Sequence, residues 1–165
     1  MADIVELILA DHGLIRRLLA ELDATWQRAD GTGPGPALPY LWQTLAALLE
    51  AHLGTAEEIG FLALFDQAAT TERNSARGTH DDIREALGEA RLHPAGSPLW
   101  RLAVLAARAG ALEHIHDLES GPLARFQRDV SPQIRETLGR QWLAFAAALD
   151  ADQDFMPGRG SPQRR

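Results

Sequence analysis

The apolar residues of this chain recur at spacings of three and four, which is the period of an α-helix buried along one face. The first segment shows this pattern most clearly. Its inward positions are Val5, Ile8, His12, Ile15, Leu19, Leu22 and Trp26. No competing strand pattern is present. The sequence therefore predicts an all-α protein.

Cap and turn residues set the expected ends of the first two helices. Asp3 is placed to cap the first helix, and Glu6 three residues later completes a capping box. The segment 30–39 is rich in glycine and proline, which cannot continue a helix, so it ends the first one. The second helix is expected from residue 39 or 40 to about residues 65–69.

The third helix has two candidate starts. It begins either at Thr79, which leaves the polar segment 70–79 as a loop or a weak extra turn, or upstream of Gly78. With the Thr79 start, His80 lies in the first turn of the helix.

Serine–proline pairs mark the later helices, because proline is favoured at the first helical position. Ser97–Pro98 starts a fourth helix that is expected to run to about Phe126, with a kink at Gly121–Pro122. Ser131–Pro132 starts a fifth, which runs through Trp142 to about Leu149.

The mostly short links predict an up-down four-helix bundle, with the additional C-terminal helix packed outside it or across one end. We assign residues 1–150 to this single domain and 151–165 to a disordered tail.

The composition of the chain excludes several classes of function. The net charge of -7 argues against a nucleic-acid partner, and the absence of cysteine removes disulfides and thiolate ligands. The N-terminus carries acids where a signal peptide would carry basic residues, and arginines interrupt each apolar run, so no membrane span is expected. We expect a soluble cytoplasmic protein. Arginine supplies all 16 positive charges, a bias typical of GC-rich bacterial genes.

Histidine is distributed unusually along the chain. His93 lies in a loop before a proline, but each expected bundle helix carries at least one histidine on an apolar face. Burying several imidazoles together is costly unless each finds a partner. A shared metal ion would be such a partner, because neutral imidazole binds iron, zinc or copper and bundles build metal sites from facing helices. The candidate ligands are His12, His52, His80, His114 and His116.

Acidic residues follow two of these histidines, but at a spacing that places them on a different face of the helix from the histidine. A residue four positions after a helical histidine shares its face, and those positions hold Ala56 and Leu118. Glu57 and Glu119 come one residue later. Five residues rotate a regular helix about 140° past the starting face. A π-bulge could correct this offset.

Two faces of the expected fourth helix compete for the centre of the bundle. One apolar stripe carries His116 together with Glu119, three residues apart, and the other carries His114 together with Leu118. Periodicity does not decide between these stripes, so both histidines are candidates.

Four stretches of the chain resemble the helical motifs of the hemerythrin-like (HHE cation-binding) domain family. They are LILADHGLIRRLLAEL, LLEAHLGTAEEIGFLALF, THDDIREALGEAR and ALEHIHDLESGPLARF, and they span roughly residues 3–128. The resemblance implies an up-down four-helix bundle with a non-haem di-iron centre. In that centre, histidines from all four helices bind the irons, and two carboxylates bridge them.

The chain departs from this family pattern at three positions. Family members carry an acid four residues after the second histidine, and many carry one after the last, where this chain has Ala56 and Leu118. Classical hemerythrins instead place an aspartate five residues after the last histidine, which is the spacing of Glu119. Arg84 stands where hemerythrins have a further histidine. Carried over by position, the implied ligands are His12, His52, His80 and His114, with Glu57 and Glu119 as candidate bridges.

The resemblance favours a protein that binds or senses oxygen, a peroxide or nitric oxide at one or two non-haem irons. The alternative is a bundle without metal that binds a partner or a small ligand, and Ala56 and Leu118 favour it. An enzyme is less favoured, because serine nucleophile motifs, phosphate-binding glycine loops and dinucleotide fingerprints are absent.

The four tryptophans are expected in the packing, and an exposed one would mark a homodimer face.

Overall fold

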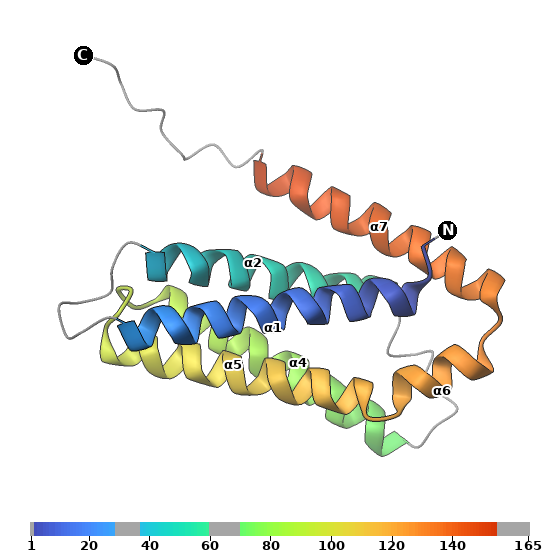
Figure 1. Cartoon of the computed structure of the whole chain (residues 1–165), viewed down its shortest axis with the longest axis horizontal. Helices are drawn as coiled ribbons and strands as arrows, with labels where there is room; N and C mark the ends of the chain where they lie inside the picture. The colour runs from blue at the N-terminus through green and yellow to red at the C-terminus, as the bar shows by residue number, and fades with distance from the viewer. Residues whose placement is uncertain (1, 29–36, 60–69, 155–165) are drawn as a thin grey trace, which may run out of the picture.

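The computed structural model describes residues 2–28, 37–59 and 70–154. Within these ranges the protein is helical and has no strand, so the predicted all-α class is confirmed. Four long helices lie side by side and alternate in direction (Figure 1). We call them the bundle helices: α1 (Ile4–Arg28), α2 (Ala37–Glu58), α4 (Thr70–Arg91) and α5 (Pro98–Glu119).

Local capping explains where two of these helices begin. The N–H of Val5 donates to Asp3 Oδ1 at 2.9 Å, so Asp3 caps α1 as predicted. The N–H of Trp100 donates to Ser97 Oγ at 3.2 Å, and Pro98 occupies the first helical position of α5.

Two boundaries differ from the sequence-based expectation. Helix α4 begins at Thr70, so the loop assignment of 70–79 is wrong and the start upstream of Gly78 is correct. Helix α2 ends at Glu58, well short of the predicted end, and the rest of that predicted stretch, 60–69, lies outside the described residues.

The predicted kink after α5 is a break between two helices. Helix α5 ends at Glu119, and the short helix α6 (Pro122–Asp129) begins after Ser120 and Gly121. Pro122 has no N–H to continue the hydrogen-bond ladder of α5, which is why the helix stops there.

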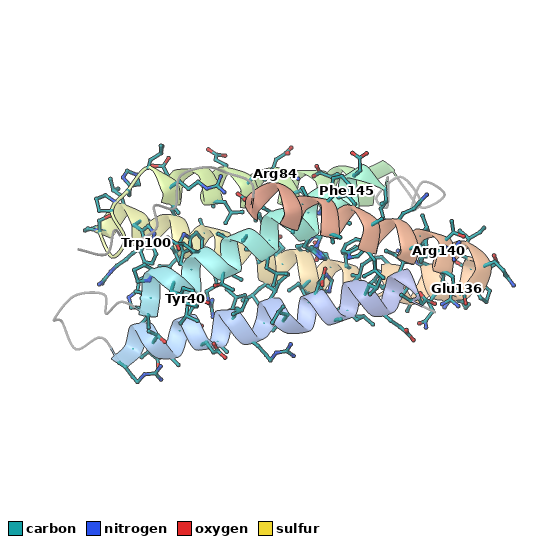
Figure 2. The ribbon with its side chains drawn as sticks, turned by 90° about the horizontal axis from the view of Figure 1, so that it is seen from above. Tyr40, Arg84, Trp100, Glu136, Arg140 and Phe145 are labelled. Carbon is teal, nitrogen blue, oxygen red and sulfur yellow. The ribbon has the colours of Figure 1, made fainter. Side chains whose placement is uncertain are left out.

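Helix α7 (Pro132–Asp154) is the predicted fifth helix. It packs on α1 and α2 and crosses the outside of the bundle at an angle (Figures 1 and 2). It also continues past residue 151, where the tail was expected to start; residues 155–165 lie outside the described ranges. No helix in the described ranges is long and apolar enough to cross a lipid bilayer.

The interior contains two apolar clusters with a polar layer between them. The larger cluster includes Trp42 and Trp100, with Trp26 packed against it, and the smaller one includes Ile8 and Trp142. Along α1, α2 and α5, most residues of the larger cluster lie on one side of the buried histidine, and the residues of the smaller cluster lie on the other. The helix packing therefore gathers the buried imidazoles at one level.

Candidate metal centre

Four histidines, one from each bundle helix, are buried in this polar layer. They are His12 on α1, His52 on α2, His80 on α4 and His114 on α5, and none is more than 4% exposed. We call these four residues the histidine cluster. Each lies on the apolar face of its helix, which is why packing the four helices brings the rings together.

The rings of the cluster contact one another at steep angles. The ring of His52 lies 5.1 Å from that of His12 and 5.4 Å from that of His114, and His80 lies 4.8 Å from His114. The Nε2 atoms of His52 and His114 are 3.3 Å apart. Ligand nitrogens of His12, His52 and His114 all lie within 4.8 Å of one another. That spacing is suitable for a shared metal ion.

Carboxylates border the cluster from outside and bind the Nδ1 side of three rings. The pairs are His12–Glu119 at 2.9 Å, His52–Asp11 at 3.2 Å and His80–Glu57 at 3.0 Å. An ionised carboxylate only accepts hydrogen bonds, so each of these Nδ1 atoms donates an N–H. In a neutral ring this leaves Nε2 bare and able to bind a metal.

Two arginines hold the glutamates in these positions. Arg16 donates to the two oxygens of Glu119 at 2.9 and 2.7 Å, and Arg84 donates to the two oxygens of Glu57 at 2.6 and 2.8 Å. Each arginine lies four residues after the histidine that its glutamate binds, on the same helical face. The site therefore contains two matching chains that run from guanidinium through carboxylate to imidazole.

Three polar atoms in the core have no hydrogen-bond partner among the described residues. They are His12 Nε2, His80 Nε2 and Thr55 Oγ1. Leaving a buried polar atom unpaired costs about 1–3 kcal/mol, so an ion or a water that paired with these atoms would stabilise the protein. Two of the three belong to the histidine cluster.

Burial favours the neutral form of His12, His80 and His114. Removal from solvent lowers the pKa of His12 to about 4, and the neighbouring His52 lowers it further while Glu119 opposes the shift. Burial and the surrounding histidines lower the pKa of His114 to about 2. Burial also lowers the pKa of His80, against the opposing effect of Glu57. Neutral imidazole is the form that binds metals.

The two glutamates remain ionised for a different reason. Hydrogen bonds from Arg16 lower the pKa of the Glu119 carboxyl, although partial burial opposes them. Burial alone would raise the pKa of Glu57, but the hydrogen bonds from Arg84 and His80 outweigh it and the pKa is lowered. Both carboxylates are therefore ionised and paired with their arginines.

The structure places His114 inside and His116 outside. His114 is buried, whereas His116 is exposed and does not join the cluster. Leu102 and Leu105, which share the His116 stripe, are 63% and 49% exposed. The stripe with His114 is the inner face of α5, so the alternative site built on His116 and Glu119 is not formed.

In this structure Glu57 and Glu119 do not lie between the imidazoles, where a bridging carboxylate would be. Both carboxylates lie at Nδ1 on the outer side of the rings, and α2 and α5 are regular helices through these positions, without a π-bulge. The inner positions one residue earlier belong to Ala56 and Leu118, which are buried in the smaller apolar cluster. The physical reason is the rotation of about 140° that five residues impose.

Sequence reasoning missed three residues that shape this site. Asp11 binds His52 across two helices, Arg16 fixes Glu119, and the ring of Trp142 lies 5.4 Å from that of His52. The recurring arginine four residues after a histidine, on both α1 and α4, was a signal that could have revealed Arg16. Nothing in the local sequence marks Asp11 or Trp142, because their contacts depend on how helices pack.

The donor set does not match two carboxylate-bridged irons. Among the described residues, the group of side chains able to share a metal contains His12, His52 and His114 and no carboxylate. The nitrogen atoms do match an imidazole-bound ion, since neutral imidazole is a good ligand for zinc, copper, iron and nickel.

Comparison with known proteins gives one match. The family model described as the hemerythrin HHE cation binding domain matches residues 3–125, which include all four bundle helices and the start of α6. No curated protein and no solved structure matches the chain. Helix α7 lies beyond the matched range.

Proposed function

The chain belongs to the hemerythrin HHE cation-binding domain family, and on that premise we propose that its histidine cluster binds a transition-metal ion. By analogy with the family the ion is non-haem iron, and its role is to bind or sense a small ligand: oxygen, a peroxide or nitric oxide. The observation that carries the proposal is the group of ligand nitrogens of His12, His52 and His114, which lie within 4.8 Å of one another.

The protonation pattern supports a metal over a purely structural role. The carboxylates fix the proton on Nδ1 of His12 and His80, and the opposite nitrogen of each ring is buried without a partner. A metal ion bound to His12, with a protonated ligand that donates to His80, would give both nitrogens a partner. The outer carboxylates resemble the partners that commonly orient metal-binding histidines.

The burial of the cluster favours a small ligand. Its four histidines are at most 4% exposed, so an organic substrate has no room beside the ion without large movement. A metal held by three imidazoles keeps at least one coordination position free. Binding or sensing of a diatomic molecule or a peroxide is therefore a better match than chemistry on a larger substrate.

A metal-free bundle is the second candidate. The apolar Ala56 and Leu118 at the inner positions, and the outer carboxylates that already bind three of the imidazoles, favour it. In that case the cluster would be a hydrogen-bonded polar layer, and the function would lie in a partner or ligand surface.

Metal content separates the two candidates. The protein would be purified without a histidine tag or chelators, loaded anaerobically with Fe²⁺, desalted and analysed for metal. The proposal expects iron to remain bound in the wild type and to be lost in His52→Gln. A folded wild-type protein that retains no metal would support the metal-free bundle.

His114 and His116 provide a matched pair of variants for the same assay. His114→Ala removes an inner ligand and should abolish stable metal binding, whereas His116→Ala changes an exposed side chain two residues away and should retain it. Loss of metal in His116→Ala alone would contradict the assignment.

A further inference from the structure

We propose that the histidine cluster holds one divalent ion, bound by His12, His52 and His114, and not the pair of bridged irons that the family resemblance implied. This inference rests on the proposed function, and it adds the number of ions and the ligand set. It follows from three observations: the spacing of the nitrogens, the position of the carboxylates and the charge around the cluster.

The nitrogen spacing matches a single tetrahedral ion. Zinc–imidazole bonds are roughly 2.0–2.1 Å long, so two ligand nitrogens on one tetrahedral ion lie roughly 3.3 Å apart. The Nε2 atoms of His52 and His114 are 3.3 Å apart. A ligand nitrogen of His12 lies within 4.8 Å of both, so a small rotation of one ring would complete a three-nitrogen site.

The carboxylates are not available as bridges. Glu119 and Glu57 each use both oxygens in bonds to an arginine and one of them also in a bond to a histidine Nδ1. Moving either one between two ions would break all of these contacts and leave an arginine without its partner. Outside the rings, the same carboxylates strengthen the imidazoles as donors to one ion.

The charge around the cluster suits one divalent ion better than two. Three carboxylates (Asp11, Glu57 and Glu119) and two guanidiniums (Arg16 and Arg84) surround the four rings, so these side chains carry a net excess of one negative charge. One divalent ion nearly balances this charge. A second would place two more positive charges in the interior without an anionic ligand, which is costly in a low-dielectric environment.

His80 lies next to the three ligands, with its ring 4.8 Å from that of His114. Its Nδ1 is bonded to Glu57, so its buried Nε2 is an acceptor. That nitrogen can accept a hydrogen bond from a protonated ligand in the fourth position of the ion. The ligand set lacks oxygen donors, which favours zinc, cobalt, copper or ferrous iron over magnesium or calcium.

Cobalt titration tests the number of ions directly. Co²⁺ would be added to the metal-free protein while its visible absorption is recorded, because tetrahedral Co²⁺ absorbs much more strongly than octahedral Co²⁺. Fluorescence provides a second readout, since Trp142 lies 5.4 Å from His52 and bound Co²⁺ should quench it. We expect strong tetrahedral bands and a break at one equivalent per chain, with one Fe²⁺ retained in a parallel anaerobic loading.

Carboxylate variants distinguish an outer role from a bridging one. Glu57→Gln and Glu119→Gln should still bind one ion per chain, with affinity reduced roughly 10–100-fold. His114→Gln should lose the tetrahedral bands, and His116→Gln is the matched control that should retain them. Circular dichroism would establish that each variant is folded.

The possible outcomes separate the two proposals. Two ions per chain, with the second lost in Glu57→Gln or Glu119→Gln, would overturn the single-ion inference while leaving the proposed metal function intact. No binding of Co²⁺ or Fe²⁺ by the folded wild-type protein would overturn both. One ion that persists in His114→Gln would refute the ligand set.

Discussion

The carboxylates of Glu57 and Glu119 lie outside the histidine cluster because each follows the histidine of its own helix by five residues. A difference of one residue from the four-residue spacing rotates the side chain about 100° around the helix. Each glutamate therefore binds the imidazole of another helix at its Nδ1 atom. At the residue scale, this offset makes each glutamate a group that orients an imidazole of the cluster.

Arg16 should influence metal affinity although it does not touch the proposed ion. It is bonded to both oxygens of Glu119, which binds His12. Arg16→Gln should weaken Co²⁺ binding roughly 10-fold, the lower end of the effect of outer partners on metal sites. Because Arg16 is 45% exposed, the free energy of unfolding should change little.

Arg17→Gln is the matched control, since Arg17 is exposed on the same helix. Both dissociation constants would come from competition with a chelator of known affinity. Equal affinities for the two variants would show that Arg16 does not position His12.

The metal-free protein should lose stability as the pH falls from about 6.5 to about 4. The pKa of His12 is lowered from 6.5 to about 4 in the folded protein, so between these values the unfolded chain binds a proton that the folded chain does not. Stability therefore falls as the pH falls, by on the order of 3 kcal/mol from His12 alone.

Urea unfolding in the presence of a chelator at pH 7.5 and pH 4.5 measures this change. His12→Gln removes the titrating group and should show a smaller loss between the same two conditions. A wild-type free energy of unfolding that is unchanged at pH 4.5 would contradict the assignment of a buried, neutral His12.

At the scale of the elements, helix α7 is fixed to the start of α1 by close contacts. Arg135 Nη1 and Asp3 Oδ2 form an ion pair at 3.0 Å. Gly139 lies so close to the N-terminal segment that a Cβ there would be 2.0 Å from the Ala2 carbonyl oxygen. These contacts position Trp142 beside His52, where α7 covers one side of the histidine cluster.

Gly139→Ala should therefore displace α7. The added methyl group meets backbone, which cannot move aside as a side chain can, so we expect a loss of about 1–3 kcal/mol in the free energy of unfolding. A change in the near-ultraviolet circular dichroism should accompany it as Trp142 moves.

Gly88→Ala provides the comparison, because a Cβ at Gly88, within α4, has nothing within 4 Å. It should be neutral or stabilise the protein by up to about 1 kcal/mol, as alanine does in a helix. If both variants had the same stability, the close approach of α7 to Ala2 would be refuted.

The elements differ in how far the sequence could predict them. Periodicity and caps predicted α1, α5 and α7, because Asp3, Pro98 and Pro132 act locally. The start of α4 at Thr70 was harder to predict. The segment before Thr79 has no apolar period, and its residues, Gly78 among them, have a low helical preference. The buried histidines could be predicted from the sequence for the same reason as the core, because they recur with the same helical period.

The contacts between the site residues could not be predicted from the sequence in the same way. Whether Glu119 faces its own helix's histidine or His12 depends on the register between α5 and α1, which no local pattern encodes. The choice between His114 and His116 depended on the rotation of α5 within the bundle. Both are properties of packing, so they required the structure.

At the scale of the whole molecule, the histidine cluster is a polar layer between two apolar clusters. All four bundle helices contribute to it, so an ion there connects the helices at one level. The arginine–glutamate pairs orient His12 and His80 within this layer.

Metal binding should consequently stabilise the whole domain. An ion at 100 times its dissociation constant adds about 2.7 kcal/mol to the free energy of unfolding, which corresponds to a rise of roughly 5–10 °C in Tm for a chain of this size. Thermal unfolding with Co²⁺ and with Mg²⁺ measures it, and only Co²⁺ should have this effect. An unchanged Tm at saturating Co²⁺ would mean that the ion does not bind the folded core.

The most direct test of the metal centre is a crystal structure of the cobalt-loaded protein, with data collected on either side of the cobalt absorption edge. Anomalous scattering locates the ion without reference to the protein geometry. The account predicts one peak, within roughly 2.0–2.3 Å of the ring nitrogens of His12, His52 and His114, with Glu57 and Glu119 still bonded to their arginines. Two peaks bridged by these glutamates, or no peak at the histidines, would contradict it.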